Sequence, residues 1–135
     1  MRILKSCILL SAMFASHTAM ACNLTTHHYG AEAIRNAVID LTFDVLPGQT
    51  YCQRFGDNYT VVVITDAYAM NNNMVVGHAI VGIRPKNSNA VPTARFTGAV
   101  IDPQKFSQQD AHKAALQAAR NALTDLGRNL SHYPR

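Results

Sequence analysis

Residues 59–84 read YTVVVITDAYAMNNNMVVGHAIVGIR, and this stretch decides the fold. It contains two runs rich in β-branched residues, 59–70 and 74–84, which are typical of strands. Between them lie Asn71, Asn72 and Asn73, whose side chains tolerate the left-handed backbone of a tight connection. The stretch therefore predicts two neighbouring antiparallel strands joined by a short turn.

The segments on both sides of this hairpin predict two helices and additional strands. Apolar residues recur at helical spacing over residues 28–44, and Pro47-Gly48 ends that pattern. Residues 50–55 are a candidate short strand, and residues 94–101 form another strand before Asp102-Pro103.

The C-terminal part predicts an alanine-rich helix over residues 108–126. Ser107 is suited to cap its start, and Gly127 is a natural end. An alanine-rich face would let this helix lie close to a sheet. We expect residues 130–135 to form a loose tail.

These elements predict the α+β class: a single two-layer domain in which two helices, one N-terminal and one C-terminal, pack on an antiparallel sheet of three to four strands. The two central strands are apolar on both sides, with Val61 and Val63 on one side and Val62 and Ile64 on the other. One side packs on the helices. The other is either covered by the remaining chain or is an interface with a partner, such as a second copy in a homodimer.

Residues 1–21 have the pattern of a secretory signal peptide. Arg2 and Lys5 precede a short apolar run, and Ala19-Met20-Ala21 supplies a small-residue cleavage frame. We therefore expect residues 22–135 to be a single mature domain, located in the periplasm or secreted. Removal of residues 1–21 would lower the formal net charge from +4 to +2, because Arg2 and Lys5 are lost. This small, scattered charge excludes nucleic acid as an expected partner.

Cys22 and Cys52 would be the two cysteines of the mature chain, and an oxidising compartment favours a disulfide between them. Cys22 also follows the cleavage frame directly, which leaves open an envelope lipoprotein that carries its lipid on Cys22. A membrane contact is expected only in that second case.

No histidine or cysteine spacing typical of a metal site occurs, and we expect neither a metal nor a cofactor. His78 opens a hydrophobic strand and Asp102 closes the next one, which resembles the histidine and aspartate half of the papain-like peptidases. That resemblance implies a small cysteine hydrolase. It lacks the cysteine at a helix start that the family uses as its nucleophile, so a hydrolase, papain-like or metal-dependent, is the alternative hypothesis.

Our leading hypothesis is a small, exported, disulfide-stabilised binding protein without a catalytic set, of the inhibitor or immunity type. A third hypothesis is an envelope lipoprotein or a subunit of a surface assembly. The expected partner is a protein of the cell envelope or the extracellular space. Its predicted contact residues lie in two loops and combine a polar turn with a basic rim: Asn71, Asn72, Asn73, Arg84, Lys86 and Arg95.

Overall fold

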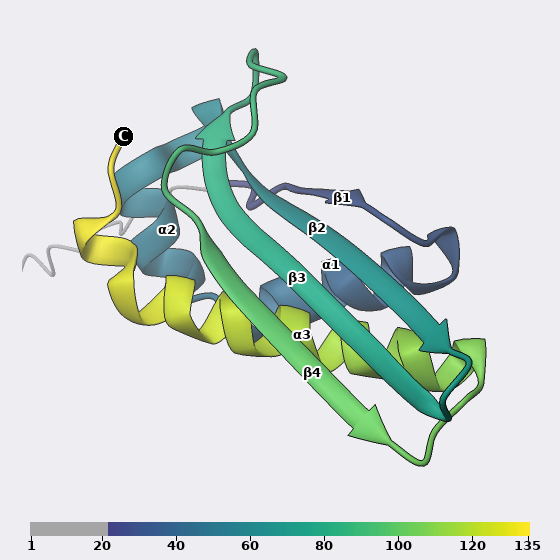
Figure 1. Ribbon diagram of the computed structural model, residues 1–135. Coiled ribbons are helices and arrows are strands. Elements are labelled where there is room, and N and C mark those ends of the chain that lie inside the picture. Colours follow the sequence, from purple (N-terminus) through teal and green to yellow (C-terminus); the bar gives the residue numbers. More distant parts are fainter. Residues whose placement is uncertain (1–21) are drawn as a thin grey trace, which may run out of the picture.

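The computed structural model describes residues 22–135, and the predicted signal peptide, residues 1–21, lies outside the described residues. A four-stranded sheet forms one layer and the helices form the other, so the predicted α+β class is confirmed (Figure 1). Within residues 22–135, no helix is long and apolar enough to cross a membrane. The elements are β1 (Thr26–Tyr29), α1 (Arg35–Val45), α2 (Gly48–Phe55), β2 (Tyr59–Met70), β3 (Met74–Pro85), β4 (Phe96–Pro103) and α3 (Gln108–Asn129), with single 3-10 turns at Glu32–Ile34, Gly56–Asn58 and Leu130–His132.

The strand order in the sheet is the order in the chain, β1-β2-β3-β4. The predicted hairpin is confirmed: β2 and β3 pair antiparallel along their whole length, from Tyr59 opposite Pro85 to Met70 opposite Met74. β4 continues the antiparallel arrangement. β1 runs parallel to β2, so the sheet is mixed and the expectation of a purely antiparallel sheet was wrong. A parallel neighbour requires a crossover, which α1 and α2 provide.

The core lies between the sheet and the helix layer, and α3 forms the largest part of that layer. The sheet-facing alanines of α3 are buried, and they bring the helix backbone close to β3 and β4 as predicted. Gly77 of β3 and Gly98 of β4 are the contact points, because a Cβ on either would overlap the backbone of Ala114 or Ala118. Ser107 caps α3 as predicted, since its Oγ accepts a hydrogen bond of 3.0 Å from the backbone N–H of Asp110.

The predicted N-terminal helix starts later than expected. Residues 26–29 form β1, and helical structure begins only at Glu32. Gly30 separates the two with a φ of 148°, a conformation that favours glycine, and a Cβ there would overlap Thr65. β1 is held by β2, where the carbonyl of Thr25 accepts a hydrogen bond of 2.9 Å from the N–H of Val61.

The predicted strand over residues 50–55 is a helix, α2. Tyr51 and Phe55 lie one helical turn apart and are both buried, with ring centroids 5.4 Å apart. Both side chains belong to the hydrophobic core, and α2 lies beside the C-terminal part of α3 (Figure 1).

The predicted loose tail is part of the core, and α3 does not stop at Gly127 but continues to Asn129. Tyr133 is buried at 4% exposure. Its hydroxyl accepts a hydrogen bond of 2.8 Å from the N–H of Ile83 and donates one of 2.5 Å to the carbonyl of Ala94. The carbonyl of Tyr133 in turn accepts hydrogen bonds from the guanidinium of Arg54.

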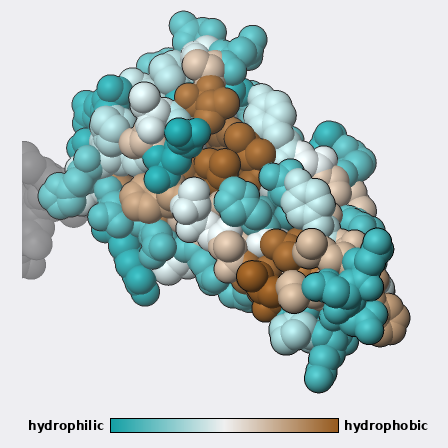
Figure 2. Space-filling view, in the orientation of Figure 1, coloured by the Kyte–Doolittle hydropathy of each residue, from teal (hydrophilic) through white to brown (hydrophobic). Residues whose placement is uncertain are grey.

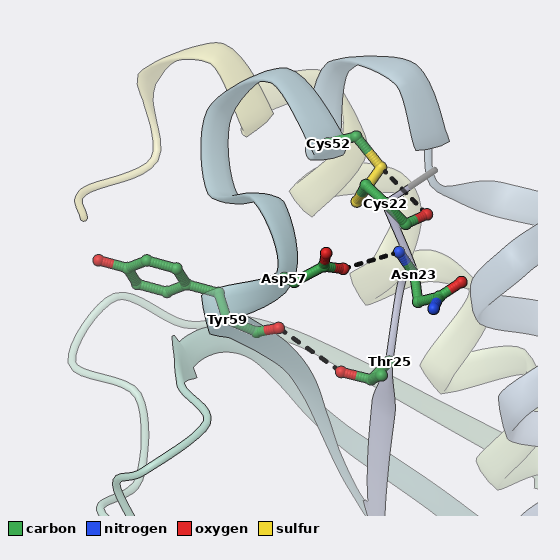
Figure 3. Close-up of a disulfide and its surroundings, with 6 residues drawn as sticks. All are labelled: Cys22, Asn23, Thr25, Cys52, Asp57 and Tyr59. Carbon is green, nitrogen blue, oxygen red and sulfur yellow. Dashed lines mark hydrogen bonds between the residues drawn. A yellow bond between two sulfur atoms is a disulfide. The ribbon is translucent and has the colours of Figure 1, made fainter. Parts of the chain in front are cut away.

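A disulfide joins Cys22 to Cys52, in agreement with the expected pairing, with 5.5 Å between their Cα atoms. It connects the segment before β1 to α2, 30 residues away (Figure 3). Beside it, the backbone N–H of Asn23 donates a hydrogen bond of 2.9 Å to the carboxylate of Asp57. The start of the described chain is therefore fixed to the domain at two neighbouring points.

Candidate binding surface

The sheet has an outer face, turned away from the helices, and only part of it is covered. Figure 2 views this face and shows hydrophobic residues in two groups, one near its middle and one toward the end that carries the β2–β3 turn. Residues 86–95 cover part of the first region. A Cβ on Gly82 would overlap the side chain of Pro92 and the carbonyl of Ala94, which shows how closely this loop lies over β3.

Arg84 fastens that loop to the outer face. Only 5% of the residue is exposed. Its guanidinium donates hydrogen bonds of 3.1 Å to the carbonyl of Ala90 and of 2.7 Å to the hydroxyl of Tyr29, and it lies 5.6 Å from the Tyr29 ring centroid. Arg84 thus links β3, β1 and the 86–95 loop, and it is not the exposed contact that the sequence analysis expected.

The other end of the outer face is left uncovered by residues 22–135. Tyr68 on β2 lies opposite Val76 on β3, which lies opposite Ile101 on β4, so the three form one row across the sheet. Tyr68 is 56% exposed and Ile101 is 63% exposed. Directly opposed side chains on one face of a sheet are in contact range, so the row is a continuous apolar strip.

A second row extends the strip to the end of the hairpin, next to the β2–β3 turn. Met70 lies opposite Met74, and Met74 lies opposite Pro103. We call the two rows together the distal patch: Tyr68, Met70, Met74, Val76, Ile101 and Pro103. A shallow hollow of about 680 Å³ borders it between Tyr68, Val76 and the turn at Asn71. Unbranched methionine side chains adapt their shape readily, which suits a recognition surface.

Asp66 and His78 form the polar boundary of the distal patch. They lie opposite each other on β2 and β3, one row further along the outer face. The Nδ1 of His78 is 3.9 Å from the nearer carboxylate oxygen of Asp66, which is an ion-pair distance when His78 is protonated and too long for a hydrogen bond. Both side chains are open to solvent, so the pair adds little to stability and can face a partner.

The six predicted contact residues do not form one surface. Asn71, Asn72 and Asn73 are exposed at the turn beside the distal patch, and Asn73 has a φ of 55°, in the left-handed region expected for asparagine. Lys86 and Arg95 are exposed at the other end of β3. With a rise of about 3.3 Å per residue, the strand separates the two groups by roughly 35 Å.

The structure does not bring His78 and Asp102 together. His78 lies opposite Ala99, and Asp102 is three positions further along β4. An odd offset puts the two side chains on opposite faces of the sheet. The sulfurs of Cys22 and Cys52 are bonded to each other, so neither is a free thiol nucleophile. Within the described residues, no three His, Cys, Asp or Glu side chains are placed to hold a metal ion.

The residues of the distal patch were not predicted from the sequence. The sequence did indicate that the side of the sheet turned away from the helices is apolar. Alternation along residues 59–84 identifies which side chains share a face. It does not give the register of β4, which adds Ile101 to the row, or the course of residues 86–95, which cover only one end.

Comparisons with known proteins add a distant structural likeness. No protein-family model matches the chain, and no curated protein matches it. Among solved structures, the chain is similar to one described as a "putative lipoprotein from Caulobacter crescentus CB15", with a TM-score of 0.41 and 19% sequence identity over 82% of this chain and 93% of that one. The described part of this chain is a disulfide-stabilised α+β domain with an uncovered apolar patch.

Proposed function

We propose that this chain is an exported protein of the cell envelope or the extracellular space that acts by binding another protein through the distal patch. The carrying observation is the contiguous exposure of Tyr68, Met70 and Ile101 on the part of the outer sheet face that residues 86–95 and the rest of the described chain leave uncovered. Small proteins seldom leave such an apolar surface open without a use for it. The polar turn at residues 71–73 and the Asp66–His78 pair give the patch a hydrophilic rim, as recognition surfaces commonly have.

Two features support export. Residues 1–21 have the sequence pattern of a signal peptide. The disulfide between Cys22 and Cys52 is a bond that persists in oxidising compartments. Inhibitors and immunity proteins of secreted enzymes combine small size, export and a disulfide, and they are the class of binding protein that we propose.

Removal of two large side chains from the patch tests the proposal. In Tyr68→Ser/Met70→Ser, both changes are on β2, at residues that are 56% and 48% exposed, so the melting temperature should stay within about 2 °C of the parent. The matched control is Phe43→Ser, which removes a 53% exposed aromatic from α1 in the helix layer. A photo-crosslinker at residue 72 of each protein, used in the producing cell, should yield a defined adduct with the parent and with Phe43→Ser. Equal adduct yield from the double variant would refute the proposal.

The second candidate is an envelope lipoprotein. Its support is the position of Cys22 directly after Ala19-Met20-Ala21. A lipid at Cys22 would be attached through the same sulfur that bonds Cys52 in this structure, so the two states exclude each other. The intact mass of the exported protein decides between them: a mass increase equal to acyl chains together with a free Cys52 thiol supports the lipoprotein, and a chain that gains two hydrogens on reduction supports the disulfide.

A further inference from the structure

The end of β3 farthest from the distal patch carries a buried positive charge. Arg84 is 5% exposed, and arginine stays protonated in proteins. Buried charges are commonly paired with an opposite charge. No acidic side chain of residues 22–135 is paired with Arg84, and residues 1–21 contain no aspartate or glutamate. The ion pairs within residues 22–135 are Glu32–Arg35, Asp66–His78 and Asp125–Arg128.

The hydrogen bonds of this guanidinium leave some of its donors unused. A guanidinium has five N–H donors. Its terminal nitrogens donate to the carbonyl of Ala90 and to the hydroxyl of Tyr29, and one of them lies 3.4 Å from Nδ1 of His27. None of these three groups carries a negative charge. The Nε of Arg84 is buried and has no hydrogen-bond partner within residues 22–135. An acceptor with a negative charge would therefore satisfy both the free donor and the charge.

A pocket of about 240 Å³ adjoins Arg84. It is bounded by the end of β3, by the 86–95 loop and by the end of the chain that follows α3. Its lining includes Arg84 and Arg135 and contains no aspartate or glutamate, and Ser88 and Thr93 contribute hydroxyl groups to it. The pocket is therefore positively charged and lined with hydrogen-bond donors.

We propose that this pocket binds a small oxyanion, a molecule that carries a carboxylate or a phosphate group, with Arg84 as its principal partner. Ala90 accepts a hydrogen bond from Arg84 and also lines the pocket, which places the guanidinium close to the pocket wall. Oxygens of carboxylates and phosphates match the donor geometry of a guanidinium. Because its hydrogen bonds to Ala90 and Tyr29 already hold Arg84 in place, binding orders little additional side chain. Arg135 adds a second positive charge.

The anion pocket and the distal patch are separate sites. Arg84 lies near one end of β3, and Val76, which borders the hollow at the distal patch, lies near the other end. The proposal therefore does not rest on the proposed function.

Titration of the exported, oxidised protein with inorganic phosphate and, separately, with succinate tests the proposal. Ionic strength is kept constant with sodium chloride. The backbone amide NMR signals of the end of β3, the 86–95 loop and residues 133–135 should shift in a saturable way. Saturation by phosphate alone, by succinate alone or by both supports the proposal and tells the phosphate class of ligand from the carboxylate class. No saturable shift with either anion at tens of millimolar, or shifts that sodium chloride alone reproduces, would overturn it.

Variants of the two arginines test which groups bind the anion. Arg84→Lys keeps the positive charge but loses the planar set of donors, and it should weaken binding about tenfold. Arg135→Gln, at an exposed residue, should weaken binding about threefold while the far-UV circular dichroism spectrum stays unchanged. Arg120→Gln is the control, because it makes the same charge change at an exposed residue of α3 outside the pocket.

Arg135→Gln decides the question if Arg84→Lys does not fold. Binding as tight as that of the parent in every folded variant would overturn the proposal. The variant Tyr68→Ser/Met70→Ser should bind the anion as tightly as the parent does, so failure of the proposed function is distinguishable from failure of the anion pocket.

Discussion

The backbone of Gly77 on β3 lies directly against the backbone of Ala114 on α3, with no room for a Cβ between them. Gly77→Ala should therefore force the helix away from the sheet and lower the free energy of unfolding by about 1–3 kcal/mol. Chemical denaturation measures this. Gly48→Ala is the control, because a Cβ at Gly48 meets nothing within 4 Å. Equal stabilities of the two variants would show that the contact is looser than described.

The hydroxyl of Tyr133 should contribute measurably to stability. Tyr133→Phe leaves the buried N–H of Ile83 without its partner at 2.8 Å, and an unsatisfied buried donor costs about 1–3 kcal/mol. Tyr68→Phe removes the same atom from a residue that is 56% exposed and should change stability by less than about 0.5 kcal/mol. Urea denaturation of both variants against the parent separates the two cases, and indistinguishable midpoints would contradict the assignment.

The disulfide should account for a large share of the stability. It closes a segment of 30 residues, for which the chain-entropy argument gives about 3–4 kcal/mol. Cys22→Ser/Cys52→Ser should lose this amount, and the parent unfolded in the presence of reductant should lose about as much. If the double variant is as stable as the oxidised parent, the bond does not constrain the unfolded chain as we expect.

Stability should fall as the pH drops below about 6.5 because of His28. Burial lowers the pKa of His28 in the folded chain, the nearby Arg35 lowers it further, and Glu32 opposes both. Its Nε2 lies 2.7 Å from the hydroxyl of Thr65. The unfolded chain then binds a proton more readily than the folded chain. The contribution of neutral His28 to the unfolding free energy is therefore complete above the pKa of the unfolded chain, and it is lost as the pH falls toward the lower pKa of the folded chain.

Measurement of the unfolding free energy from pH 8 to pH 5 checks this expectation. His28→Gln keeps a polar partner for Thr65 and should flatten the profile between those limits. Its stability at pH 8, where His28 is neutral, gives the cost of the substitution itself. A parent profile of the same slope as the variant would contradict the role of His28.

The hairpin and α3 could be predicted from sequence because their patterns are long and locally consistent. Residues 59–84 carry two β-branched runs around an asparagine turn, and α3 has both a capping serine and an alanine-rich face. Each signal extends over many residues, so local preference and tertiary packing favour the same structure.

The elements that were missed lack such signals. Tyr51 and Phe55 are four residues apart, a spacing that puts two side chains on the same side of a strand and also of a helix. β1 has four residues and is formed by its pairing with β2. Tyr133 is buried because of partners 50 and 39 residues earlier in the chain. Such long-range contacts leave no trace in a local pattern.

The same limit applies to the candidate surface. The apolar outer side of β2 and β3 could be predicted from alternation. The exposure of its distal half could not, because it depends on where residues 86–95 run and on how Arg84 holds them.

The location of the disulfide has a consequence for how the chain matures. Cys22 precedes β1 and Cys52 precedes β2, and the pairing of β1 with β2 holds the two cysteines close together, so we expect most chains to oxidise after the crossover through α1 has formed. The hairpin and the strand after it need only local contacts and should form earlier. We therefore expect oxidation to follow the formation of the sheet and to fix β1 in its place beside β2. Thiol trapping during refolding measures the fraction of protein in which the two cysteines are paired. This fraction should report how much of the protein has completed the pairing of β1 with β2.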